Sequence, residues 1–153
     1  MVLSIGEILA DMIGNTAENS IEIKAFIGGA PFNVAVNCLK AGSKVGFCGR
    51  VGKDPVGKFL IDVSKRIGFD YLDIQEDEDR NTTLAFVTLT DGERDFAFYR
   101  HDTADFNIEL DKIDFDKLEN LNIIHLGSLM LSEENGVELA KSVVNKAKEL
   151  NVN

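Results

Sequence analysis

The sequence contains no tryptophan and only two cysteines, two prolines and two histidines in 153 residues. The cysteines, Cys38 and Cys48, show no CxxC or Cys/His spacing, which gives no support to a metal or redox role. They are interpreted as reduced, buried small side chains. No apolar run reaches the length of a membrane span, and no cationic stretch followed by an apolar one marks a signal peptide. These absences predict a cytoplasmic protein without a bound metal.

Basic residues are scarce as well: 16 Lys and Arg stand against 26 Asp and Glu, a formal net charge of −10. Binding to a phosphate backbone needs a basic face, so nucleic acid is not expected as a partner. A single nucleotide is not excluded, because local groups can hold it. With 44% hydrophobic residues, the chain is long enough to bury the core of one domain.

The hydrophobic pattern alternates strands with helices. Apolar runs at Val2–Gly6, Val45–Cys48 and Asn122–Leu126 are typical of buried strands. Helices are predicted over Ala30–Ala41, from an Asp54 cap with Pro55 behind it to Gly68, and from a Ser132 cap to Leu150 with the stripe Val137, Ala140, Val144 and Ala147. This order indicates a layered α/β domain with a mainly parallel sheet.

Two further stretches fit that core poorly and predict a small second sheet. Ser20–Ile27 alternates apolar with polar residues, and Thr83–Thr90 and Phe96–Arg100 flank Asp91-Gly92, a strong hairpin signal. The acidic run between Asp70 and Asp79 is interpreted as a solvated loop. The last helix runs out where another βα unit would begin, so we expect an open sheet edge and a chain that is truncated or completed by another polypeptide.

The segment Gly28-Gly29-Ala30-Pro31-Phe32-Asn33 joins a strand to a helix and is a candidate binding site. Paired glycines allow a ligand close to the backbone, and the helix start offers free N–H groups to an oxygen-rich ligand. Asn33 and Asn37 lie one turn apart on an otherwise apolar helix. A tight turn, with both amides bonded to the backbone, explains the segment equally well.

Several motifs in the right order resemble the PfkB carbohydrate kinases, and specifically their fructokinase form. The stretch GGAPFNVAVNCLKAG at Gly28–Gly42 looks like the family's first signature, and GRVGKDPVG at Gly49–Gly57 resembles its GxVGxDxxG segment. Gly6-Glu7 with Asp11 resembles the opening strand, Thr83–Arg100 the lid hairpin, and HLGS from His125 the strand end that follows.

The resemblance implies a ribokinase-like three-layer α/β/α fold with a small β-sheet lid at about 11–27 and 83–100, residues 1–153 being its N-terminal part and the C-terminal half being absent. It assigns Asp11 to the sugar hydroxyls, since a carboxylate accepts from two at once. The remaining assigned residues are Gly28, Gly29, Asn33, Phe86, Phe98 and Arg100, the last three from the lid. A solvated rim charge is the alternative for Arg100, and plain lid packing is the alternative for the two phenylalanines.

Asp11 bears on the substrate, because a carboxylate would repel the acidic sugar of the 2-keto-3-deoxygluconate kinases, which also tend to place a tyrosine where this chain has Phe98. Fructose is therefore the expected substrate, and 2-keto-3-deoxygluconate and ribose are the alternatives. The expected reaction is transfer of the γ-phosphoryl of MgATP to a sugar hydroxyl by the parent protein.

The phosphate-transfer residues that the resemblance implies are missing from this sequence. In the family the catalytic base is the Asp of a Gly-Ala-Gly-Asp segment, and no such segment occurs here, so no catalytic residue is assigned and the chain alone is expected to be inactive. A non-catalytic sugar-binding or dimerisation module is the alternative function, and a homodimer through the lid is expected.

Two other features are interpreted as structural. Gly52–Lys58 fits G-x-x-x-x-G-K, but Phe59 replaces the Mg²⁺-binding hydroxyl and Pro55 removes an N–H, so a helix cap is preferred to a P-loop. His101 is interpreted as part of a loop, and His125 as a satisfied core residue.

Overall fold

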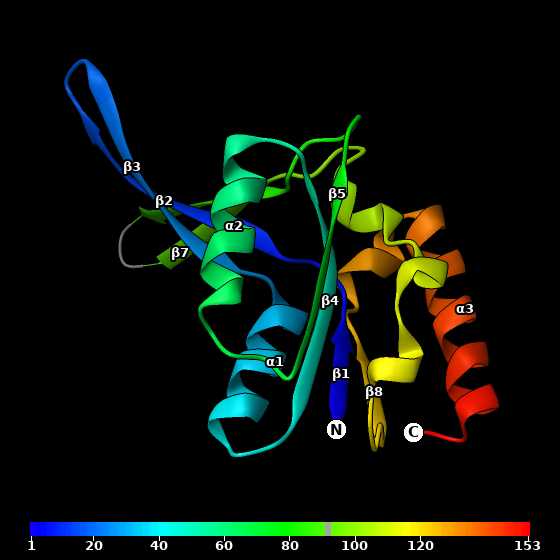
Figure 1. The fold of residues 1–153 in the computed structure, drawn as a ribbon. Coiled ribbons are helices and arrows are strands. Elements are labelled where there is room, and N and C mark those ends of the chain that lie inside the picture. The colour runs from blue at the N-terminus through cyan, green and yellow to red at the C-terminus, as the bar shows by residue number, and fades with distance from the viewer. Residues whose placement is uncertain (91–92) are drawn as a thin grey trace.

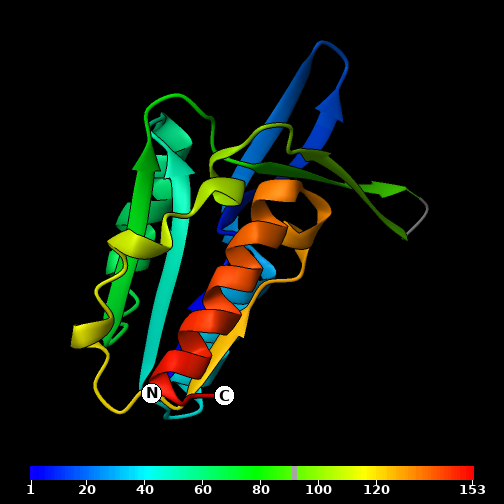
Figure 2. The same cartoon turned by 90° about the vertical axis from the view of Figure 1, so that its right-hand side faces the viewer.

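The computed structural model describes residues 1–90 and 93–153, with the side chains of residues 15–17 and 88–96 outside the description. The sheet of its core is fully parallel, in the order β5-β4-β1-β8, and consists of β1 (Val2–Ile5), β4 (Val45–Gly52), β5 (Tyr71–Asp77) and β8 (Ile123–Leu126). Helices α1 (Ala30–Lys40) and α2 (Pro55–Lys65) cover one face, and α3 (Glu134–Leu150) covers the other (Figures 1 and 2). The predicted three-layer α/β/α architecture is confirmed.

Alternation along the strands builds the two halves of the core. Leu3 and Ile5 of β1 pack toward the α3 side with Met130 and Leu139. Val45, Phe47 and Val51 of β4 are among the residues that pack toward α1 and α2, around Phe32. Because side chains of a strand alternate between faces, a buried parallel sheet needs apolar residues on both. The apolar runs of the sequence meet that need.

Four strands form the small second sheet, which projects from the core (Figure 1) and is called the lid below. They are β2 (Leu9–Ala17), β3 (Ser20–Gly28), β6 (Leu84–Thr90) and β7 (Glu93–Tyr99), in the order β3-β2-β6-β7. β2 pairs antiparallel with β3 and parallel with β6, and β6 pairs antiparallel with β7. The predicted lid hairpin is therefore present, and its expected turn, Asp91-Gly92, lies outside the described residues.

Between the lid and β8 the chain forms short 3-10 turns that the sequence did not predict. They are η1 (Ala104–Asn107), η2 (Leu110–Lys112) and η3 (Phe115–Lys117), and a further turn, η4 (Leu129–Ser132), precedes α3. Ile108 and Ile113 of this stretch are buried in the core on the α3 side. The turns therefore fill the space between sheet and helix.

The acidic run was wrongly predicted to be a loop. Residues 71–77 form β5 at the edge of the parallel sheet, paired along its whole length with β4. Asp77 is 2% exposed and forms an ion pair with Arg50 at 2.9 Å, and Gln75 bonds to the backbone of Glu109. Oδ1 of Asp77 accepts from the N–H groups of Asp79 and Arg80, but its ion pair with Arg50 and the bonds of Gln75 join residues distant in sequence, which a local pattern does not reveal.

The predictions for the last helix also need correction. Ser132 ends η4 and its hydroxyl donates to the Leu129 carbonyl at 2.8 Å, so it does not cap α3, whose N-cap is Glu133. The buried face of α3 is Gly136, Leu139 and Val143, and Val144 of the predicted stripe is 49% exposed. The predicted stripe has the same spacing as the buried face but lies one residue further along the chain, so α3 packs with its apolar stripe turned by about 100° from the core.

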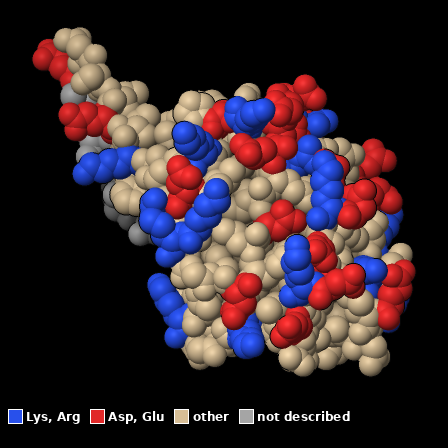
Figure 3. Space-filling view, viewed as in Figure 1, with Lys and Arg blue, Asp and Glu red and all other residues tan. Residues whose placement is uncertain are grey.

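The predictions for Cys48 as a buried side chain and for His125 as a bonded residue at a strand end are confirmed. Cys48 is buried, Cys38 is partly buried and both are free, and His125 bonds to Ser4. No helix among the described residues is long and apolar enough to cross a membrane. On the face seen in Figure 3, the described Lys and Arg residues are interspersed with Asp and Glu rather than gathered in a basic patch.

Candidate functional site

Asp11 lies on β2 directly over the backbone of Gly28 on β3. A Cβ atom built on Gly28 would overlap the Asp11 carboxylate, so only glycine leaves room for the acid in this position. Burial raises the pKa of Asp11 above its ordinary value. The carboxylate is thus held half-buried against a bare stretch of backbone, where hydroxyls of a small polar ligand could reach both.

Gly29 follows as the N-cap of α1, with a φ of 111° that a side chain would rarely adopt. A Cβ there would overlap the Glu7 carbonyl, which brings the end of β1 against the helix start. No side chain of the turn caps α1, but Pro31 has no N–H, and the Ala30 N–H faces the Glu7 carboxylate and opposes the rise in its pKa that burial causes. Gly29 and the exposed Asn33 are therefore the positions at which the helix start can offer polar groups to an oxygen-rich ligand.

Asn33 is exposed one turn into α1, and Asn37 donates to the Asn33 carbonyl at 2.8 Å. The structure therefore brings Asp11, Gly28, Gly29 and Asn33 to one place, at the junction of lid and core. The Asn37 amide is bonded to the backbone, as expected if the segment is a tight turn rather than a binding site at that residue.

Glu7 belongs to the same region, and the sequence analysis assigned it no role. It is 1% exposed, and its Oε2 has no hydrogen-bond partner among the described residues. Burial raises its pKa, while the nearby Arg100 opposes that rise. Gly127 at the end of β8 makes room for it, because a Cβ there would lie 2.7 Å from Oε2. The sequence could have pointed to Glu7, because it is a charged residue directly after an apolar strand.

The register of the lid separates its aromatic residues onto two faces. Asp11 pairs with Ala85 and with Phe26, and Ala85 pairs with Phe98, so these four share what we call the inner face. Phe86 is one residue on from Ala85 and therefore points to the opposite, outer face, where its ring lies 5.0 Å from that of Tyr99. The expectation that Phe86 and Phe98 face one ligand from the same side is not met by this register.

Arg100 follows β7 and is not a solvated rim charge, since its side chain is only 6% exposed. Its Nη2 and Nε donate to Oδ2 of Asp105 at 2.6 and 2.9 Å, and Nη1 donates to the Leu129 carbonyl at 2.9 Å. The guanidinium also lies over the Phe106 ring, 3.8 Å from its centroid. The Arg100 side chain was predicted to face the sugar from the lid, and it is held by partners within the protein.

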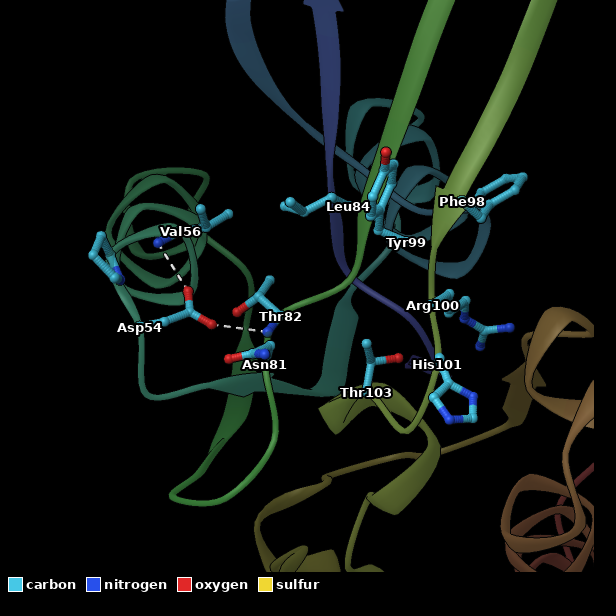
Figure 4. Close-up of a pocket in the computed structure, with 11 residues that line it drawn as sticks. Asp54, Val56, Asn81, Thr82, Leu84, Phe98, Tyr99, Arg100, His101 and Thr103 are labelled. Atoms are coloured by element: carbon cyan, nitrogen blue, oxygen red, sulfur yellow. Dashed lines mark hydrogen bonds between the residues drawn. The ribbon is translucent and has the colours of Figure 1, made fainter.

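A cavity of about 690 Å³ lies at the base of the lid. Figure 4 shows Leu84 and Tyr99 on one side of the lid hairpin and Phe98 and Arg100 on the other, and all four line the cavity. Asp54 borders the cavity and caps α2, with its Oδ1 accepting from Val56 and Gly57 at 2.9 and 2.8 Å. The lining includes neither Asp11 nor a residue of α1, so the cavity reaches the inner face of the lid without containing the cluster around Asp11.

The P-loop alternative fails on the same geometry. The Asp54 carboxylate occupies the N-terminus of α2, and Pro55 at the first helical position has no N–H. A phosphate of ATP does not fit a helix end that already holds a carboxylate. Among the described residues no cluster of three or more His, Cys, Asp or Glu side chains could hold a metal ion.

Comparison with curated proteins shows similarity to plant fructokinases. The chain is 37% identical over 156 residues to probable fructokinase-6, chloroplastic, of Arabidopsis thaliana, covering 99% of this chain and 41% of the relative. It is also 37% identical over 139 residues to a fructokinase of Solanum tuberosum, covering 88% of this chain and 44% of the relative. The chain thus spans less than half the length of these relatives.

Solved structures give the same result. The fructokinase of Xylella fastidiosa superposes with a TM-score of 0.86 at 31% identity, over 97% of this chain and 47% of that one. A second structure of it, described as containing bound ATP, gives 0.85 at 32% identity, over 97% and 45%. Residues 1–153 as a whole match the pfkB family carbohydrate kinases, and the chain belongs to that family.

Proposed function

We propose that this chain supplies the sugar-binding half of an ATP-dependent kinase that phosphorylates a hydroxyl of fructose. The observation that carries the proposal is the Asp11 carboxylate, held over Gly28 on the inner face of the lid. Gly29 and Asn33 lie beside it at the start of α1. A carboxylate and an exposed amide side chain in one place suit a polyhydroxylated neutral ligand. The fructokinases among the relatives support fructose as that ligand.

The two faces of the lid give its aromatic residues different roles in the proposed site. Phe98 is 50% exposed on the inner face, where its ring can cover the apolar side of a sugar. The proposed ligand would lie between this ring, Asp11 and the start of α1. Phe86, on the outer face, is proposed to support the lid through its contact with Tyr99.

The MgATP end of the reaction is proposed to reside outside residues 1–153. The similarity to an ATP-bound fructokinase supports ATP as the phosphoryl donor. The helix start that most resembles a P-loop is filled by Asp54, and we assign no residue of this chain to Mg²⁺. We therefore predict that the 153-residue chain alone transfers no phosphoryl group from ATP to fructose, and turnover by the purified chain would contradict this division.

Calorimetric titration of the 153-residue chain with D-fructose tests the sugar site. Asp11→Asn keeps the side-chain shape but removes the charge, and a hydrogen bond to a charged group contributes about 1.5–3 kcal/mol. We expect the affinity to fall at least about tenfold. Asp62→Asn, an exposed acid on α2, is the matched control and should leave binding unchanged. Equal affinity of wild type and the Asp11 variant would overturn the proposed role.

We also propose a homodimer through the outer face of the lid. Ile21, Ile23 and Tyr99 alternate onto this face and are 64%, 40% and 65% exposed. Exposed apolar side chains gathered on one face are typical of an association surface. Light scattering during size exclusion should give a dimer mass that Ile23→Asp reduces to the monomer. Ile13→Asp is the control, since Ile13 is 44% exposed on the inner face.

A further inference from the structure

Arg100 lies on the same side of the lid as Asp11, as does Lys24, which pairs with Ile13 further out on the lid. Arg100 is two residues from Phe98. Phe98 pairs with Ala85, and Ala85 pairs with Asp11, so Arg100, Phe98 and Asp11 lie on the inner face. Arg100 also acts electrostatically on Glu7, whose carbonyl borders Gly29. A free guanidinium in this position would attract an acidic ligand, because it binds carboxylates in a bidentate manner.

Asp105 prevents that use of Arg100. Its Oδ2 accepts from both Nε and Nη2, which is the part of the guanidinium that a ligand carboxylate would need. The side chains of Arg100 and Asp105 are 6% and 1% exposed, so the pair is closed to solvent. The remaining edge of the guanidinium is bonded to the Leu129 carbonyl.

The other oxygen of Asp105 fixes the pair to the base of the lid. Its Oδ1 accepts from the hydroxyls of Thr83 and Thr103 at 2.6 and 2.7 Å. Thr83 directly precedes β6, and Arg100 directly follows β7. Both strands of the lid hairpin are thus tied to one carboxylate, and Asp105 cannot turn away without breaking four hydrogen bonds.

We propose that Asp105 is a specificity-determining residue, which withholds the Arg100 guanidinium from the ligand and thereby restricts the site to neutral sugars. This inference rests on the proposed function and names the residue that excludes sugar acids. With Arg100 neutralised, an incoming carboxylate meets the uncompensated charge of Asp11. Asp105 acts through Arg100 and is therefore a positioning residue.

The experiment compares D-fructose with 2-keto-3-deoxygluconate, a sugar acid, in calorimetric titrations of the 153-residue chain and of Asp105→Asn. The amide keeps the shape of Asp105 but removes the charge that pairs with the guanidinium, which leaves Glu7 as the acid that acts on Arg100. We expect affinity for the acid to rise at least about tenfold. The gain should shrink as salt is added, which a merely structural effect would not show. Asp102→Asn is the control, because Asp102 pairs with Arg80 but is 69% exposed.

A second variant keeps the inference testable if Asp105→Asn does not fold. Replacing the pair together, as Arg100→Met with Asp105→Leu, removes both of its buried charges, and Glu7→Gln added to this variant removes the acid on which Arg100 acts. This combined variant should bind fructose as the wild type does and should not bind the acid. Loss of fructose binding in a folded combined variant would show that the ligand needs Arg100 directly and would overturn the inference.

The outcomes separate this inference from the proposed function. A wild-type chain that does not bind fructose counts against the proposed function. The role of Asp105 is tested by 2-keto-3-deoxygluconate alone. The quantity that decides is the ratio of the affinity of Asp105→Asn for this sugar acid to the affinity of the wild type for it. An unchanged ratio in a folded Asp105→Asn variant would overturn the role of Asp105, even where fructose binds as proposed.

Discussion

Replacing Asp54 by alanine removes the cap of α2 and a tie to the lid in one change. Oδ1 of Asp54 accepts from the N–H groups of Val56 and Gly57, and Oδ2 accepts from the buried N–H of Thr82 at 2.8 Å. Loss of an N-cap costs about 1 kcal/mol. Loss of a hydrogen bond to a charged group costs about 1.5–3 kcal/mol. We therefore expect the free energy of unfolding to fall by about 2.5–4 kcal/mol.

Urea unfolding followed by circular dichroism measures this change. With a slope of about 2 kcal/mol per molar for a small protein, the midpoint should fall by on the order of 1–2 M. Asp62→Ala on the exposed side of the same helix is the control and should change stability by less than about 0.5 kcal/mol. A loss for Asp54→Ala no larger than that of the control would refute the assignment of Asp54 as cap and anchor.

Three further predictions concern the site and its surroundings. Gly28→Ala should abolish fructose binding in titrations, because the new Cβ displaces the Asp11 carboxylate; retained affinity would contradict this contact. Burial raises the pKa of Glu7 above 4.5, so the folded state keeps a proton that the unfolded chain releases, and ionisation costs stability as pH rises above 4.5. In thermal melts, Glu7→Gln should therefore be more stable than the wild type by a margin that grows as the pH rises from 4.5 to 7. A margin that does not change with pH would count against this account of Glu7. Iodoacetamide should modify Cys38 before Cys48 in the native protein, since Cys48 is fully buried and burial raises its pKa well above 9.0; equal rates would argue against this core.

Features that depend on short-range chemistry were predictable from the sequence. The Asp54 cap with Pro55 requires only neighbouring residues, and the glycine pair before α1 marks a close approach of backbones. The face on which each lid residue lies was also within reach. A two-residue turn at 91–92 pairs Thr90 with Glu93, and counting back from it pairs Ala85 with Phe98, which puts Phe86 on the other face.

Features that depend on distant partners were not predictable. The acidic pattern of β5 resembles a loop because the ion pair that holds the buried Asp77 is made with Arg50, which lies far away in the sequence. The closed pair of Arg100 and Asp105 depends on where η1 packs, and no periodicity signals a contact between residues five apart. Both ion pairs are decided by tertiary packing rather than by local pattern.

The central claim is that the sugar site lies around Asp11 and the start of α1. Titration of ¹⁵N-labelled chain with D-fructose, followed by amide chemical shifts, tests it most directly. The account predicts that the largest shifts fall on the amides of Asp11, Gly29 and Asn33. Shifts concentrated instead at Asn81 and Tyr99, which line the 690 Å³ cavity at the lid base but lie outside the cluster around Asp11, would contradict it.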